Sequence, residues 1–204
     1  MSSINVEFNS KEINLIIMEN VLKMLERRGL INSWSDNFKK ISTDVTGKTI
    51  FDIEVKDKKK YSIYLVGAKL TSIVQGTPLD EYLSNNLDIH KIVIAKDVAK
   101  KVVKQIVVDY TNAEFFFESE MMEDIPSKVF IPVHQLISQE EKAELLNKFS
   151  EQELARIFLT DMMSRYYGAK IGDIFRIIRP SFTAGKNVFY RRVVQGSWDI
   201  LFKT

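Results

Sequence analysis

Three charged residues at alternate positions near residue 54 are the first group with the types and spacing for chemistry. Asp52, Glu54 and Lys56 would all project from one face of a strand. Two carboxylates can hold Mg²⁺ while a lysine assists the attacking water, which is the arrangement of metal-assisted phosphodiester cleavage. A half-exposed strand shows the same alternation, with Phe51 and Ile53 on its buried face. The solvated strand face is our main interpretation, and a Mg²⁺-dependent nuclease is the alternative.

A second group is a run of lysines around the start of a helix expected over Asp97–Asp109. Its members are Lys96, Lys100, Lys101 and Lys104. Amide groups at a helix start and lysine side chains can together hold nucleic-acid phosphates, without reading base sequence. The helix also has an apolar side, so a solvated lysine face is an equally weighted alternative.

Other kinds of site find little support in the sequence. His90 and His134 have no second histidine at helical spacing, and the chain has no cysteine. No phosphate-binding loop, dinucleotide fingerprint or nucleophile elbow occurs. We therefore expect no catalytic residue, no metal site and no cofactor.

Composition and charge describe an ordinary folded protein with an uneven charge distribution. The chain has 204 residues, 45% hydrophobic and 27% charged, which suits one large or two small domains. No apolar run is long enough to cross a bilayer and no secretory leader is apparent, so we expect neither secretion nor a membrane span. Lys and Arg number 17 against 14 Asp and Glu in residues 1–110, 4 against 11 in 111–164, and 8 against 2 in 165–204. The end of the chain is therefore basic, and the part before it acidic.

The first part of the chain has the pattern of an α/β domain. Apolar residues at helical spacing predict an amphipathic helix over 11–28, with Ser10 as its N-cap. Segments 49–55 and 61–66 predict an antiparallel hairpin, and helices and strands then alternate to residue 117. The pattern ends in a stretch with two prolines, so we place a domain boundary near Ser127. The predicted domains are 1–127 and 128–204.

The second domain is expected to be small and α+β. Ser138 and Glu141 form a capping-box pattern that opens a helix to about Phe149. Short helical turns are expected from there to Tyr167. Three strands should follow, in the segments IGDIFRIIRP, NVFYRRVV and WDILFK. In the first of them, Phe175 and Ile177 would face one way and Ile174, Arg176 and Ile178 the other.

A particular order of residue types marks the segment YYGAKIGDIFRIIRPSFTAGKNVFYRRVV. It contains an aromatic-Gly pair at 167–168, Gly-Asp at 172–173, a run with Arg179, Ser181, Thr183, Ala184 and Gly185, and Tyr190-Arg191 with Val193. This order closely resembles the assembly domain of the fifth subunit shared by eukaryotic nuclear RNA polymerases, and of the archaeal RNA polymerase subunit that corresponds to it. The segment VFIPVHQLISQEEKAELLNKF before it is similar to the same family, so the resemblance covers 128–194.

The sequence also departs from the family pattern. It has Leu154-Ala155 and Asp161-Met162 where the family usually has Leu-Pro and Asp-Pro. Proline stiffens turns, so this connection is expected to be more helical here. The N-terminal half resembles the family only in its order of elements and in a similar methionine and Arg-Gly sequence at residues 24–30.

The resemblance implies a scaffolding role. The N-terminal α/β domain would be a jaw beside downstream duplex DNA, with a nuclease-like topology that lacks activity. The C-terminal domain would dock on the largest subunit of a DNA-directed RNA polymerase and join its core. The lysines named above would lie nearest the DNA, in weak contacts that ignore sequence. The subunit interface would include Arg176, Arg179, Ser181, Thr183, Gly185, Tyr190 and Arg191.

The divergence from cellular members, with length kept and no charged tails, is typical of a homologue from a large cytoplasmic DNA virus. Such a protein would work in the host cytoplasm and could be packaged in virions, whereas a cellular homologue would work in the nucleus. A free-standing DNA-binding adaptor is a third hypothesis beside the polymerase subunit and the nuclease. An adaptor would bind duplex DNA alone at physiological salt, and a subunit would not.

Overall fold

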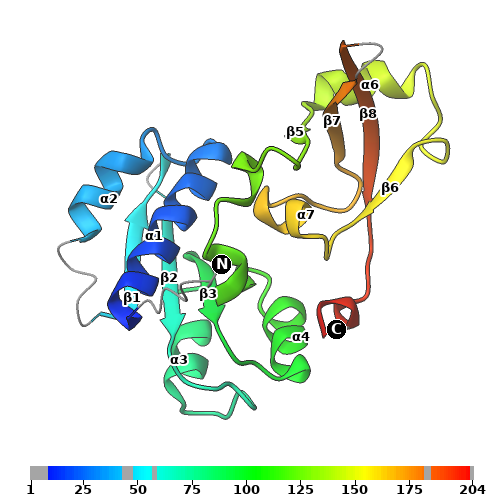
Figure 1. The fold of residues 1–204 in the computed structure, drawn as a ribbon. Coiled ribbons are helices and arrows are strands. Elements are labelled where there is room, and N and C mark those ends of the chain that lie inside the picture. Colours follow the sequence, from blue (N-terminus) through cyan, green and yellow to red (C-terminus); the bar gives the residue numbers. More distant parts are fainter. Residues whose placement is uncertain (1–8, 43–47, 57–58, 182–184, 203–204) are drawn as a thin grey trace, which may run out of the picture. The chain divides into compact units, whose positions relative to one another are not determined.

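The computed structural model describes residues 9–42, 48–56, 59–181 and 185–202 (Figure 1). The chain forms two compact units, Met1–Glu123 and Asp124–Thr204. Each unit carries one four-stranded sheet with helices, so the fold is mixed α/β. Ser127, where the sequence places the domain boundary, lies close to the start of the second unit.

The sheet of the first unit has the order β1-β2-β3-β4. Strand β1 (Ile50–Glu54) pairs antiparallel with β2 (Lys60–Val66), while β3 (His90–Ala95) and β4 (Ala113–Phe117) continue the sheet in parallel. The predicted hairpin is thus confirmed, although part of its turn lies outside the described residues. The helices of this unit are α1 (Ser10–Arg27), α2 (Trp34–Ser42), α3 (Pro78–Ser84), α4 (Lys100–Asp109) and α5 (Glu118–Met121).

Helix α1 begins at Ser10, which is the residue that the sequence predicted as its N-cap. The Asn9 side chain accepts a hydrogen bond from the Glu12 amide, and the Glu12 carboxylate accepts one from the Asn9 amide. This reciprocal capping box makes Asn9 the N-cap, so the prediction of Ser10 is wrong. The apolar stripe of the helix is buried, and Gly29 continues the chain at a φ of 73°, which glycine adopts without strain.

Helix α4 begins at Lys100 rather than at the predicted Asp97. The reason is a parallel bridge between Leu70 and Val98. The Leu70 amide donates to the Asp97 carbonyl at 2.8 Å, and the Ala99 amide donates to the Leu70 carbonyl at 2.7 Å. These bonds hold the backbone extended as far as Ala99, which is the N-cap.

The sheet of the second unit has the order β5-β7-β8-β6. Strands β7 (Ile174–Ser181) and β8 (Gly185–Val194) form its long central hairpin, and β5 (Val133–Leu136) pairs antiparallel with β7. Strand β6 (Ala155–Phe158) runs parallel to β8. The helices are η2 (Ile125–Ser127), α6 (Gln139–Leu146), α7 (Met162–Tyr166) and the 3₁₀ helix η3 (Trp198–Phe202).

Two predicted elements of this unit are wrong. Residues 155–158 were expected in helical turns, yet they form β6, because pairing with β8 and burial of Ile157 outweigh local propensity. WDILFK was expected as a strand, yet η3 forms there. The Ser197 hydroxyl accepts from the Asp199 amide at 3.3 Å, and the Ser197 carbonyl accepts from the Ile200 amide at 3.2 Å, which favours a helical turn. Helix α6 has the predicted capping box but ends at Leu146.

The predicted alternation along β7 is confirmed, and it gives the sheet two distinct faces. Phe175 and Ile177 belong to a buried cluster with Ile157, Ala169 and Val193, on what we call the Phe175 face. Ile174 packs with Leu145 and Leu154 on the opposite side, the Ile174 face. Both faces are therefore partly covered by the unit's own chain.

Gly196 provides a test of how tightly the end of β8 is packed. A Cβ added there would lie 2.6 Å from Thr160 Oγ1 and 2.9 Å from Phe158 Cβ. We expect Gly196→Ala to lower the free energy of unfolding by about 1–3 kcal/mol, measured by urea denaturation. A Cβ added at Gly67 meets no described atom within 4 Å, so Gly67→Ala is the control and should change stability by less than about 0.5 kcal/mol. Equal effects of the two substitutions would contradict the packing.

Candidate functional site

Asp52 and Glu54 lie on the solvated face of the edge strand β1, whereas Lys56 follows the strand, which ends at Glu54. All three charged side chains are exposed, and Phe51 and Ile53 are buried. Asp52 lines a hollow of about 360 Å³, whereas Glu54 and Lys56 line another of about 260 Å³. Within the described residues no group of three or more acidic or histidine side chains could hold a metal ion. The geometry therefore gives the nuclease hypothesis no support.

The predicted lysines lie between the end of β3 and the second turn of α4. Lys96, Lys100 and Lys101 are exposed, and Lys104 is half-buried. The N-cap Ala99 supplies no side chain to the first amides of α4. The positive end of the helix dipole and the lysine charges thus coincide, which is the electrostatic setting that a phosphate prefers. Binding of nucleic acid by these lysines stays a prediction.

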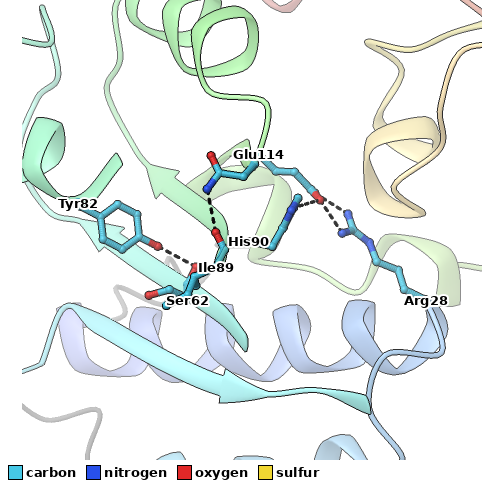
Figure 2. A network of polar contacts seen from close by, with 7 residues as sticks. Arg28, Ser62, Tyr82, Ile89, His90 and Glu114 are labelled. Atoms are coloured by element: carbon cyan, nitrogen blue, oxygen red, sulfur yellow. Dashed lines mark hydrogen bonds and ion pairs between the residues drawn. The ribbon is translucent and has the colours of Figure 1, made fainter. Parts of the chain in front are cut away.

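An ion-pair network in the first unit was not foreseen from the sequence (Figure 2). The Arg28 guanidinium donates to both carboxylate oxygens of Glu114, at 2.9 and 2.7 Å. His90 Nε2 lies 2.6 Å from Glu114 Oε1. The side chains of Arg28, Glu114 and His90 are only 6%, 23% and 29% exposed. Because Arg28 follows α1, while His90 begins β3 and Glu114 is the second residue of β4, the network ties the helix to the parallel strands.

The network shifts the ionisation of its members. Burial alone would raise the pKa of Glu114, but the Arg28 charge and the hydrogen bonds from His90 and Arg28 outweigh it and lower that pKa to about 2. The Tyr61 ring packs 4.6 Å from the His90 ring, and burial together with the Glu114 charge raises the pKa of Tyr61. Glu114 is therefore a fixed negative charge at the centre of the cluster.

Further polar contacts of this unit end on backbone carbonyls. The Tyr82 hydroxyl donates to the Ser62 carbonyl at 2.7 Å, and the Asn112 amide donates to the Ile89 carbonyl at 2.9 Å (Figure 2). Lys91 Nζ donates to the carbonyls of Leu83, at 2.7 Å, and Asn85, where α3 ends. Burial lowers the pKa of Lys91. These groups satisfy the backbone, which is a structural role.

In the second unit, the structure divides the predicted interface residues between the two faces of the sheet. Arg176 lies on the Ile174 face, where its guanidinium donates to Glu141 Oε1 at 2.9 Å and to Gln135 Oε1 at 3.0 and 3.2 Å. Tyr190 packs against the core cluster on that same face. These two residues are thus engaged within the chain.

Arg179 and Arg191 lie on the Phe175 face. Arg179 is exposed, with its guanidinium carbon 5.8 Å from the centre of the Phe189 ring, and Arg191 is half-buried. Gly185 opens β8 at a φ of 70°. Thr183 and the side chain of Ser181 lie outside the described residues.

His134 stands beside these arginines on β5. Its Nδ1 is 2.7 Å from the Pro132 carbonyl oxygen, and its ring meets Phe175 edge to face at 5.8 Å. Burial lowers the pKa of His134, and the charges of Arg191 and Arg179 also lower it, against opposing contributions from the Pro132 carbonyl and Asp161. In the neutral form Nδ1–H donates to Pro132, which leaves Nε2 as an acceptor.

Comparison with known proteins connects this second unit to one family. The family model described as the C-terminal domain of RNA polymerase Rpb5 matches residues 123–193. The chain is 30% identical over 192 residues to the subunit rpabc1 of DNA-directed RNA polymerases I, II and III from Dictyostelium discoideum. That match covers 88% of this chain and 96% of the relative.

Two further relatives come from a virus and an archaeon. The chain is 29% identical over 197 residues to DNA-directed RNA polymerase subunit 5 of Acanthamoeba polyphaga mimivirus, which covers 91% of this chain and 94% of the relative. It is 43% identical over 68 residues to DNA-directed RNA polymerase subunit Rpo5 of Archaeoglobus fulgidus, covering 32% of this chain and 90% of the relative. The similarity to the first two relatives therefore extends through both units.

The ion-pair network predicts a pH dependence of stability. The folded pKa of Glu114, about 2, lies below its ordinary value of 4.5. The contribution of its charge to stability should thus be complete above pH 4.5 and be lost as the pH falls toward 2, a change of about 3 kcal/mol. Glu114→Gln should destabilise the protein at pH 7 and flatten this pH dependence, as measured by urea denaturation at several pH values.

The exposed Glu81 provides the control, because Glu81→Gln should leave both the stability and its acid dependence unchanged. If Glu114→Gln destabilised the protein equally at pH 7 and at pH 2, the carboxylate charge would not be the stabilising feature.

Proposed function

We propose that this chain, which belongs to the family of DNA-directed RNA polymerase subunit 5, serves its polymerase as a scaffold and does no chemistry itself. The observation that carries the proposal is similarity to named polymerase subunits over 94% and 96% of their lengths. Membership of this family makes the chain a component of a multi-subunit DNA-directed RNA polymerase.

In this proposal the C-terminal domain, residues 128–204, docks on the largest subunit and holds the chain in the polymerase core. Support comes from the family match over 123–193 and from the motif, whose later part includes residues of the central hairpin β7–β8. This hairpin is paired with a further strand on each side. It is therefore a rigid platform for an interface, because a shift in register would break the backbone hydrogen bonds between the strands. The interface would use the hairpin residues identified from the sequence.

The N-terminal domain, residues 1–127, acts in this proposal as a jaw beside downstream duplex DNA. Its sheet is mostly parallel, with an antiparallel hairpin strand at one edge, and we interpret this as an inactive nuclease-like topology. The lysines around the start of α4 would approach phosphates. Only a few phosphate contacts are available there, so affinity would be weak, sequence-independent and salt-dependent.

The place of action follows from the origin that the relatives suggest. Similarity to a mimivirus subunit over 91% of this chain supports a viral homologue, which would work in the host cytoplasm and be packaged in virions. A cellular homologue would work in the nucleus. Within the described residues no helix has the length and apolar character to span a membrane.

A tagged pull-down tests the assembly role. The full-length chain, expressed in its native context, should co-purify in equal amounts with the two largest polymerase polypeptides, identified by mass spectrometry, and the eluate should synthesise RNA. Deletion of residues 128–204 should abolish recovery, because it removes the whole second sheet. Recovery of the tagged chain alone would contradict the proposed function.

The lysines can be tested by the salt dependence of DNA binding. In the assembled polymerase, Lys100→Ala with Lys101→Ala should reduce the slope of log K against log salt for downstream duplex DNA by about 2, because each phosphate that a lysine neutralises adds roughly 0.9 to that slope. The matched control is Lys39→Ala with Lys40→Ala, an adjacent exposed pair on α2 of the same unit. If both pairs changed the slope equally, the assignment of the α4 lysines to DNA would be wrong.

A further inference from the structure

The arginines of the second sheet differ in whether the chain neutralises them. On the Ile174 face, Arg176 Nη1 lies 2.9 Å from Glu141 and Arg192 Nη1 lies 3.0 Å from Glu151. Both acids come from the segment between β5 and β6, so this face has its own counterions. A partner there would have to displace an existing ion pair.

The Phe175 face is different. Within the described part of the chain, neither Arg179 nor Arg191 lies within ion-pair distance of a carboxylate. The register of the hairpin sets Phe175 opposite Arg191 and Ile177 opposite Phe189, so the two arginines stand on either side of the Phe189 ring. Phe189 is 47% exposed. Two like charges therefore flank an apolar ring that the chain itself leaves about half exposed.

His134 completes this group. It is paired with Ile177, which is paired in turn with Phe189, so the three form one cross-strand row on the Phe175 face. Its Nδ1 contacts the Pro132 carbonyl. We call Arg179, Phe189, Arg191 and His134 together the Arg179–Arg191 patch.

We propose that the Arg179–Arg191 patch binds an acidic segment of another polymerase polypeptide. A carboxylate of that segment is held by the arginines, and an apolar side chain beside it covers Phe189. Charge complementarity identifies the occupant, because the paired strands place Arg179 and Arg191 but no Asp or Glu on this face. The inference rests on the proposed function and adds to it the face used and the chemistry of the partner.

The composition of the patch favours a polypeptide over a nucleic acid. Arginine and aromatic residues are enriched in protein interfaces, where lysine is depleted, and the patch has no lysine. Arginine also forms bidentate bonds with a carboxylate, which gives such an interaction a defined geometry.

Photo-crosslinking in the assembled polymerase tests which face is used. Phe189 and Val188 are adjacent and almost equally exposed, 47% and 49%, but they lie on opposite faces of β8. A photoreactive amino acid in place of Phe189 should crosslink to a polymerase polypeptide, at a peptide rich in Asp and Glu. The same group in place of Val188 should give about tenfold less of that product. Equal products from both positions, or a product with nucleic acid at position 189, would overturn the proposal.

Charge reversal tests the chemistry. Arg179→Glu should reduce recovery of the large polymerase polypeptides about tenfold or more in 0.3 M salt, because it places like charges against each other. Arg156→Glu is the control, since Arg156 is an exposed arginine of β6 on the opposite face, and recovery should be unchanged. Replacing the crosslinked acidic residue of the partner by arginine should restore recovery with Arg179→Glu.

The outcomes separate this inference from the proposed function. If the unaltered chain did not recover the polymerase, the function itself would fail and the inference with it. If the unaltered chain recovered it and Arg179→Glu did so equally well, the inference and the assignment of Arg179 to the interface would be overturned, while the assembly role would stand. Thermal unfolding of Arg179→Glu should match that of the unaltered chain, because Arg179 is exposed, so a loss of recovery reports docking.

Discussion

The antiparallel pairing of β7 with β8 is the constraint on which the second unit depends. Its register runs from Ile174 opposite Arg192 to Ser181 opposite Gly185. Because side chains alternate between faces, this register alone decides which arginine meets which neighbour. A shift by one residue would move Phe175 and Ile177 out of the core and carry Arg176 away from Glu141. The ladder therefore fixes the core, the internal ion pairs and the exposed patch together.

The first unit depends on a different interaction, in which one largely buried charge links three elements. Glu114 on β4 is paired with Arg28 after α1 and with His90 on β3. An isolated buried carboxylate would be costly, and its lowered pKa shows that the paired form is strongly favoured. Removing one partner would leave the others uncompensated, so the cluster stabilises a specific arrangement of helix and strands.

Local patterns were sufficient to predict the elements whose own sequence carries the signal. Residue spacing and capping residues predict the hairpin β1–β2, the helix that Ser138 caps and the alternation along β7. The errors arise where contacts between residues far apart in the sequence determine the local structure. Strand β6 forms because β8 offers it a partner, and the start of α4 is delayed because Leu70 holds the preceding backbone. The Arg28–Glu114 pair joins residues 86 apart in sequence, so no local pattern could indicate it.

The predicted interface residues also show what the sequence alone cannot indicate. The sequence motif identifies Arg176, Arg179 and Arg191 as one set, because order along the chain carries no information about counterions. The structure separates them, since Glu141 from α6 reaches Arg176 but no described carboxylate reaches Arg179 or Arg191. A charge that is compensated within its own chain contributes to folding, and opening its ion pair would oppose binding. Charges without a counterion in the described chain are therefore the better guide to where a partner binds.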